Sequence, residues 1–264
     1  MTDALFYCPY WIFLLKLSPM KDGTNLSKAF DQHVKLEEYF TGFSVKTTKR
    51  NTSEQANPSK TEKTDITEEL NKIAGEVAAC QKCVLGSTRL NPVPGEGNPN
   101  AELVFVGEGP GADEDAQGRP FVGRSGQLLD KIITNAMGLK RSDVYICNIV
   151  KCRPPENREP RPEEIINCLT YLKKQLSLIR PKVIVCLGAP ATKTLLKTNQ
   201  PIGQLRGKFH DFYFDDDSEP IKLMPTFHPA YLLRNYSDDN RRKVWEDMKS
   251  VMAELGLPVP KVKN

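Results

Sequence analysis

Four cysteines of this sequence have the type and spacing of a metal site. Cys80 and Cys83 form a C-x-x-C pair directly after a helical pattern, Cys152 follows an apolar run, and Cys168 lies within a long helical pattern. Taken alone, the pair could hold structural zinc, act as a redox couple or have no role. Four thiolates can hold zinc or an iron–sulfur cluster, and no second C-x-x-C indicates a zinc ribbon. The spacing therefore leaves the metal open.

The remaining cysteines do not extend this pattern. Cys147 and Cys186 lie within apolar runs, where we expect small core residues, and Cys8 lies in the N-terminal stretch. Seven cysteines without a secretory signal favour reduced thiols and a cytoplasmic protein. The run "LFYCPYWIFLL" is far shorter than the roughly 20 residues that span a bilayer. We interpret it as a loosely anchoring segment or the product of an upstream start codon, with Met20 as the true start.

A glycine-rich turn carries several carboxylates that could act as acids or bases. The stretch "ELVFVGEGPGADED" ends an apolar run and leads into a helical pattern, which is the layout of a phosphate-binding loop. Its glycines match neither of the two nucleotide-binding patterns, however, and its acidic residues would repel a phosphate. These are Glu108, Asp113, Glu114 and Asp115. On spacing alone, a tight strand-to-helix turn is the simplest interpretation.

Two further polar residues follow apolar runs. Asn148 is the polar residue near the end of the run "VYICNIV", and His228 follows "KLMPTF". A histidine at the end of a strand is more often a hydrogen-bonded structural residue than a catalyst. His228 gains interest because Pro229, two leucines and Arg234 follow it.

The elements that must position these residues alternate along the chain. Four apolar runs, at 103–107, 144–150, 183–188 and 222–227, are rich in β-branched residues, as in buried parallel strands. Helical patterns separate or follow them at 125–138, 161–179, 189–197 and 238–255. This predicts a three-layer α/β/α sandwich with right-handed crossovers, and a hairpin or edge excursion at 207–217. Ligands of such sheets bind at the carboxyl ends of the strands, where the polar residues above should meet.

The N-terminal quarter has a different character. Residues 24–40 show helical spacing of apolar residues, and 44–64 are polar and lack periodicity. We therefore expect an extension over 1–64, made of an amphipathic helix and a flexible linker, and a domain over 65–264 that begins with a helix capped by Asp65. The net charge of +4 permits a nucleic-acid partner without demanding one.

Several motifs together resemble one family. The stretches "GEGPGADED", "GRPFVGRSGQLLD", "NIVKCRPPENREP" and "HPAYLLRN", with the four cysteines at matching intervals, resemble a family 4 uracil-DNA glycosylase of the iron–sulfur type over residues 66 to 258. The resemblance implies a uracil-DNA glycosylase-like α/β/α sandwich around a central four-stranded parallel sheet. It also implies monofunctional hydrolysis of the N-glycosidic bond of uracil in DNA, the first step of base excision repair.

The resemblance assigns a role to most of the residues above. His228 would donate to a uracil oxygen as the base leaves, Asn148 would read the pyrimidine edge, and Phe121 would stack on the base, with Gly109 beside it. Cytosine reverses the donor and acceptor that Asn148 reads. In the best-known uracil glycosylases an aspartate occupies the position that corresponds to Gly109 here.

The water activator must therefore be another group. Glu108, an acid from Asp113, Glu114 and Asp115, or a water held by the backbone are the alternatives, and we favour Glu108 and Glu114.

The remaining expectations concern DNA and the metal. Leu232 or Leu233 would fill the gap left by the flipped base. Phosphate contacts would come from Arg234, with Arg119, Arg124, Lys151 and Arg153. The resemblance also implies a 4Fe–4S cluster on Cys80, Cys83, Cys152 and Cys168. We expect a monomer without a membrane partner, whose N-terminal extension could recruit a replication or repair protein. A nucleotide-binding transferase and a non-enzymatic, metal-stabilised DNA-binding module are the competing functions.

Overall fold

A six-stranded mixed sheet forms the centre of the computed structural model, which describes residues 65–214 and 219–259. The strands are β1 (Glu96–Gly97), β2 (Leu103–Gly107), β3 (Tyr145–Asn148), β4 (Val183–Leu187), β5 (His210–Phe212) and β6 (Ile221–Thr226), in the order β1-β3-β2-β4-β6-β5. Strands β3, β2, β4 and β6 are mutually parallel, whereas β1 and β5 pair antiparallel at the two edges. The four-stranded parallel core is thus confirmed, with two short edge strands in addition.

The helices follow the alternation of the sequence. They are α2 (Ile66–Ala78), α3 (Leu85–Thr88), α4 (Ala112–Gln117), α5 (Arg124–Lys131), α6 (Pro162–Ile179), α7 (Ala189–Leu196), α8 (Ile202–Leu205), α9 (Pro229–Arg234) and α10 (Asp238–Glu254). A π-helical segment, Ile132–Ala136, continues α5, and 3-10 turns lie at Arg141–Asp143 and Pro155–Asn157. As expected, the Asp65 carboxylate caps α2 by accepting the backbone N–H of Thr67.

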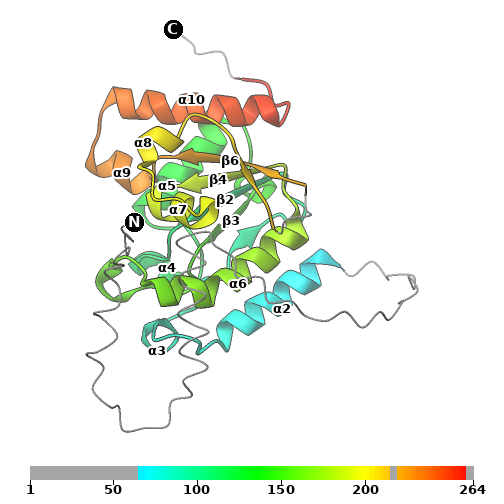
Figure 1. Ribbon diagram of the computed structural model, residues 1–264, viewed down its shortest axis with the longest axis vertical. Coiled ribbons are helices and arrows are strands. Elements are labelled where there is room, and N and C mark those ends of the chain that lie inside the picture. Colours follow the sequence, from blue (N-terminus) through cyan, green and yellow to red (C-terminus); the bar gives the residue numbers. More distant parts are fainter. Residues whose placement is uncertain (1–64, 215–218, 260–264) are drawn as a thin grey trace, which may run out of the picture. The chain divides into compact units, whose positions relative to one another are not determined.

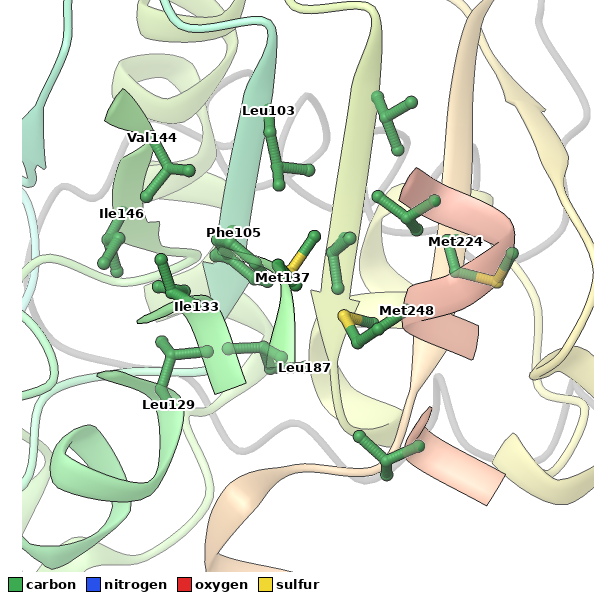
Figure 2. Packing of buried hydrophobic residues seen from close by; sticks show 14 of the residues in the cluster. Leu103, Phe105, Leu129, Ile133, Met137, Val144, Ile146, Leu187, Met224 and Met248 are labelled. Atoms are coloured by element: carbon green, nitrogen blue, oxygen red, sulfur yellow. The ribbon is translucent and has the colours of Figure 1, made fainter. Parts of the chain in front are cut away.

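Helices cover the sheet on both sides. In Figure 1, α10 lies on one side of the strands, and α6 with α2 lies on the other. Figure 2 shows the core on the α10 side, where Leu129 and Ile133, Phe105 of β2 and Met248 of α10 lie close together. Each of these four side chains is at most 1% exposed. The three layers therefore agree with the sequence-based expectation.

The edge excursion expected at 207–217 is confirmed in part. Strand β5 pairs with β6 in that stretch, with His210 opposite Leu223. The amphipathic helix and linker expected within 1–64 lie outside the described residues. None of the helices in the described ranges is long and apolar enough to cross a membrane.

Candidate functional site

A cavity of ≈ 270 Å³ lies where the parallel strands end at their carboxyl termini. Asn148 is the last residue of β3, Glu108 and Gly109 directly follow β2, and His228 follows β6 by two residues. The segment between α4 and α5 adds Phe121. The structure thus brings together all six residues that we expected to act on the base, namely Glu108, Gly109, Glu114, Phe121, Asn148 and His228.

The side chains of Asn148 and Phe121 pack so closely against the end of β2 that only glycine fits at position 107. A Cβ atom on Gly107 would lie 2.4 Å from Asn148 Oδ1 and 2.6 Å from Phe121 Cζ. Gly107 also pairs with Asn148 across the parallel ladder. The glycine run therefore lets an amide and an aromatic ring meet the backbone, which explains the turn without any phosphate.

Asn148 carries the most unusual polar atom of the site. Its side chain is 1% exposed, and Oδ1 is the one buried side-chain nitrogen or oxygen without a hydrogen-bond partner in the described residues. Leaving a buried acceptor unpaired costs about 1–3 kcal/mol. Such an atom at a cavity wall is suited to accept an N–H from a ligand.

His228 is held in one tautomer by the helix that it caps. Its Nδ1 accepts the backbone N–H of Ala230 at 3.0 Å, so a neutral ring carries its proton on Nε2. Burial, and to a lesser degree the charge of Arg234, lowers the pKa of His228 to about 4. Near neutral pH the ring is therefore an uncharged hydrogen-bond donor.

Phe121 stands beside this imidazole with a strained backbone. The two ring centroids are 5.7 Å apart with an interplanar angle of 33°. Phe121 has φ 51°, a left-handed conformation that is uncommon for a bulky residue. A Cβ atom on Gly126 would lie 1.9 Å from the Phe121 carbonyl oxygen, so this glycine is also required. The ring is fixed in place rather than free to move.

The carboxylates of the glycine-rich turn differ in what they contact. Burial, followed by the charge of Glu159, raises the pKa of Glu108 to about 7. Glu114 instead accepts three backbone N–H groups, from Gly111 at 3.1 Å and from Val122 and Gly123 at 2.9 Å each. Glu108 thus has the properties of a base poised near neutral pH, whereas Glu114 holds the loop around Phe121.

The acidic residues deeper in α4 serve the fold. Asp115 is 3% exposed and accepts the backbone N–H groups of Leu90, at 2.9 Å, and Asn91. It does not line the cavity. The excess of carboxylates in this turn is therefore explained by several separate tasks.

The four cysteines interact with one another. Burial raises the pKa of the Cys168 thiol to about 11, and the neighbouring Cys152 and Cys83 add to this effect. Burial also raises the pKa of Cys152, which Arg89 opposes and Cys83 and Cys80 reinforce. The Arg89 guanidinium donates to Cys152 Sγ at 2.9 Å, and the Lys151 backbone N–H donates to Cys168 Sγ at 3.2 Å. The four thiols thus lie within electrostatic range of one another, and Cys152 and Cys168 each accept a hydrogen bond at sulfur.

The fit of a metal depends on the separation between these sulfurs. Within the described ranges, no three His, Cys, Asp or Glu side chains form a group that could hold a single metal ion. In a 4Fe–4S cluster each thiolate binds a different iron, so the four sulfurs lie farther apart than they would around a single metal ion. Four cysteines that influence one another electrostatically, two of them with N–H donors at sulfur, are a donor set of the kind that such a cluster requires. Cys147 and Cys186 are fully buried strand residues, as expected.

Two of the residues considered for DNA contact, Leu232 and Lys151, are buried in the structure. Leu232 is 5% exposed and belongs to the hydrophobic core, so it cannot enter DNA, whereas Leu233 is 48% exposed. Lys151 is fully buried, and its ammonium donates to the Asn148 carbonyl oxygen at 2.9 Å and to Gln175 Oε1 at 2.7 Å. Arg119 pairs with Glu96 through two hydrogen bonds. Of the two leucines, only Leu233 therefore remains as the residue that could fill the gap left by the flipped base.

Sequence reasoning missed part of the cavity wall. Pro154, Asn157 and Arg158 line it from the segment after β3. Arg158 makes two hydrogen bonds to the Glu164 carboxylate, at 2.8 and 2.7 Å, which fixes this segment to α6. Asn157 has φ 54°. The stretch "RPPENREP" carried a signal, because prolines and an asparagine directly after a strand indicate a shaped loop.

Comparison with known proteins agrees with this geometry. The family model described as the uracil DNA glycosylase superfamily matches residues 94–249. A type-4 uracil-DNA glycosylase of Saccharolobus solfataricus is 45% identical over 190 residues, which cover 70% of this chain and 86% of that protein. A type-4 enzyme of Thermotoga maritima is 48% identical over 69% of this chain and 93% of its own length. A type-5 uracil-DNA glycosylase of Pyrobaculum aerophilum is 38% identical over 62% of this chain and 77% of that protein.

Proposed function

The chain belongs to the uracil-DNA glycosylase superfamily and is a type-4-like uracil-DNA glycosylase, and from this premise we propose how its residues remove the base. The enzyme hydrolyses the N-glycosidic bond of uracil in DNA and leaves an abasic site, which begins base excision repair. The nucleotide must leave the duplex to reach the cavity.

Recognition of the base rests on the unpaired acceptor of Asn148. Oδ1 accepts the ring N–H of uracil, and the amide nitrogen donates to the adjacent uracil oxygen. Cytosine offers an acceptor where uracil offers that N–H, so its binding would leave two buried groups unsatisfied. Phe121 stacks on the ring. The orphaned oxygen at the cavity wall is the single observation that carries this assignment.

Departure of the base depends on His228. Cleavage of the bond leaves negative charge on uracil, and the Nε2–H of the neutral ring donates to the uracil oxygen where that charge develops. A neutral donor gives up no proton and needs no rearrangement during the reaction. Its low pKa keeps it in this form across the neutral range.

Glu108 activates the water that attacks the sugar cation. With a pKa of about 7, its carboxylate accepts a proton more readily than an ordinary glutamate does. Glu114, whose oxygens already accept three backbone N–H groups, acts by holding the loop that presents Phe121. A Cβ atom on Gly109 would lie 2.7 Å from Val150 Cγ2, so this glycine lets the turn pack closely against the loop after β3 beside the bound nucleotide.

The DNA surface adjoins the cavity through α9. The exposed Leu233 fills the space left by the extruded nucleotide, and Arg234 contacts a neighbouring phosphate. Arg124 and Arg153 are further phosphate contacts. A duplex held in this way should bind more weakly as the salt concentration rises.

Cys80, Cys83, Cys152 and Cys168 hold a 4Fe–4S cluster. Such a cluster, when bound, supplies a rigid link among the segments that carry its ligands. These segments are the end of α2, the loop after β3 that also lines the cavity, and α6. The protein acts as a cytoplasmic monomer, and residues 1–64 form an extension to the catalytic domain of 65–264 that recruits a replication or repair partner.

One assay tests the activity. The full-length protein is incubated with a duplex oligonucleotide that carries a single uracil, and alkali then reveals abasic sites. Free uracil and strand cleavage only after alkali are the expected result, and His228→Asn is the matched inactive variant. Binding of the duplex without release of uracil would instead indicate a non-enzymatic DNA-binding module.

A further inference from the structure

The backbone around Phe121 is held from two opposite directions by two side chains. On one side, Glu114 accepts the N–H groups of Val122 and Gly123, both at 2.9 Å. On the other side, Arg141 donates to the carbonyl oxygens of Pro120, at 2.5 Å, and of Phe121, at 3.2 Å. Four consecutive residues of the loop are thus fixed through their peptide groups.

Such bonding is needed because Phe121 adopts a conformation that its own chemistry disfavours. A left-handed backbone on a bulky residue persists only when its surroundings over-determine it. The conformation has a use, because it directs the ring toward His228 and into the cavity wall. Residues that stabilise the carbonyl groups of this loop therefore decide where the stacking ring lies.

Arg141 is itself rigidly anchored outside the cavity. Its guanidinium donates twice to Glu96 Oε1, at 3.0 and 2.9 Å, and once to Asp130 Oδ1, at 2.5 Å. Glu96 belongs to edge strand β1, and Asp130 belongs to α5. Burial raises the pKa of Glu96, but hydrogen bonds from Arg119 and Arg141 lower it by more. The pKa therefore lies below its usual value, and this anchor stays charged.

We propose that Arg141 is a positioning residue for uracil recognition, which acts by holding Phe121 in its stacking position. The inference rests on the proposed role of Phe121 in the glycosylase reaction. Arg141 does not line the cavity and touches no reacting atom. Its planar guanidinium reaches two carbonyls and two carboxylates at once, which the point charge of a lysine cannot do.

A double-mutant cycle on the full-length protein tests this role. Single-turnover excision of uracil is measured for Arg141→Met, Phe121→Ala and the double variant. We expect Arg141→Met to lower the rate by about tenfold, the midrange of coupling between contacting residues, and to have little further effect once Phe121 is alanine. A mere loss of folded protein would lower the rate by the same factor in both backgrounds.

Arg119→Met provides the matched control. Arg119 makes two hydrogen bonds to the same Glu96 carboxylate, but among the described residues it bonds to neither loop carbonyl. Whatever its size, the effect of Arg119→Met on the excision rate should be independent of Phe121→Ala, so the two rate factors should multiply in the double variant. Arg141→Lys gives the same cycle with the positive charge retained, should the methionine variant not fold.

The outcomes separate the two levels of the argument. If the wild-type protein releases no uracil, the proposed function is wrong. If the wild type is active but Arg141 and Phe121 variants combine multiplicatively, or Arg141→Met and Arg141→Lys keep the full rate, only the positioning role is overturned.

Discussion

The Nδ1 atom of His228 accepts the backbone N–H of Ala230 at 3.0 Å, and this bond determines which nitrogen of the imidazole can act on a ligand. Because His228 caps α9 with Nδ1, its proton lies on Nε2. The same bond that begins the helix therefore orients a hydrogen-bond donor in the cavity. One hydrogen bond therefore both caps α9 and fixes the tautomer of His228.

Replacement of His228 should separate these two tasks. Asparagine can still cap a helix, so His228→Asn should leave the unfolding midpoint nearly unchanged. Without the Nε2–H at the uracil oxygen, the single-turnover rate should fall by about 10²–10³-fold, as for the loss of one oxyanion donor. A variant that retains the full excision rate would remove His228 from the reaction.

Glu108 should determine how the reaction rate depends on pH. Since the carboxyl has a pKa of about 7 and must be ionised to accept a proton, the rate should rise as pH increases toward 7 and level off above it. Glu108→Gln should be slower by about 10²–10⁴-fold and should lose this dependence. Glu159→Gln should shift the profile to lower pH, because it removes the second cause of the raised pKa.

The same carboxyl should leave a signature in stability. Its pKa is higher in the folded than in the unfolded state, so the folded protein binds more protons between about pH 4.5 and 7. The free energy of unfolding should therefore decrease as pH rises through this window. Denaturant titrations of the wild type and Glu108→Gln, compared at both ends, measure the difference; an identical slope in both would contradict the raised pKa.

Asn148 should show a conflict between activity and stability. Its Oδ1 is buried without a partner, so Asn148→Ala removes an unsatisfied group at the expense of a small gap. We expect an unfolding midpoint equal to or above that of the wild type, but excision slowed by about 5- to 160-fold, which corresponds to the roughly 1–3 kcal/mol of an unmade buried hydrogen bond. A large loss of stability with normal activity would assign the residue to the fold instead.

Replacement of a cysteine should have different effects at the proposed cluster ligands and at the core cysteines. Cys168→Ser should reduce the iron content of anaerobically purified protein, bleach its visible absorbance and lower its unfolding midpoint. Cys186→Ala, a change at a fully buried strand cysteine, should leave iron and colour unchanged. A colourless wild-type protein that contains one zinc would contradict the cluster.

The adjacent leucines of α9 should behave differently. Leu232 is a core residue, and its replacement by alanine should cost about 2–5 kcal/mol of unfolding free energy. Leu233 is half exposed, so Leu233→Ala should leave stability unchanged and weaken binding of a duplex that carries an abasic site. The two variants, measured by denaturation and by fluorescence anisotropy of labelled DNA, serve as each other's control.

Much of the fold could be predicted because its strands are continuous apolar runs. The run at 103–107 is strand β2 without any shift. The run at 144–150 continues past the end of β3 at Asn148, since Ile149 and Val150 are buried in the following loop, where their N–H groups bond to the Gly107 and Glu108 carbonyls. Strand β1 has only two residues and no apolar pattern, so the sequence offered no signal for it.

The site was harder to predict where burial depends on tertiary packing. The sequence predicts a surface charge at Lys151, because lysine is almost never fully buried. Its amide partner Gln175 is 24 residues away, in α6. The contact between Arg141 and the Phe121 loop likewise joins residues 20 apart whose spacing follows no motif. Phe121 and Asn148, which we propose stack on the base and read its edge, belong to short, recognisable stretches, so the sequence indicates them directly.

Helix α9 is only six residues long, yet it has His228 at its start and the exposed Leu233 near its end. One short helix thus joins the residue proposed to act on the base to the residue proposed to enter the duplex. Energy gained where the protein grips the flanking strand should then reach the reacting bond and speed the reaction rather than tighten binding. A lone deoxyuridine would contribute none of that energy, so we expect the enzyme to leave the free nucleoside uncleaved.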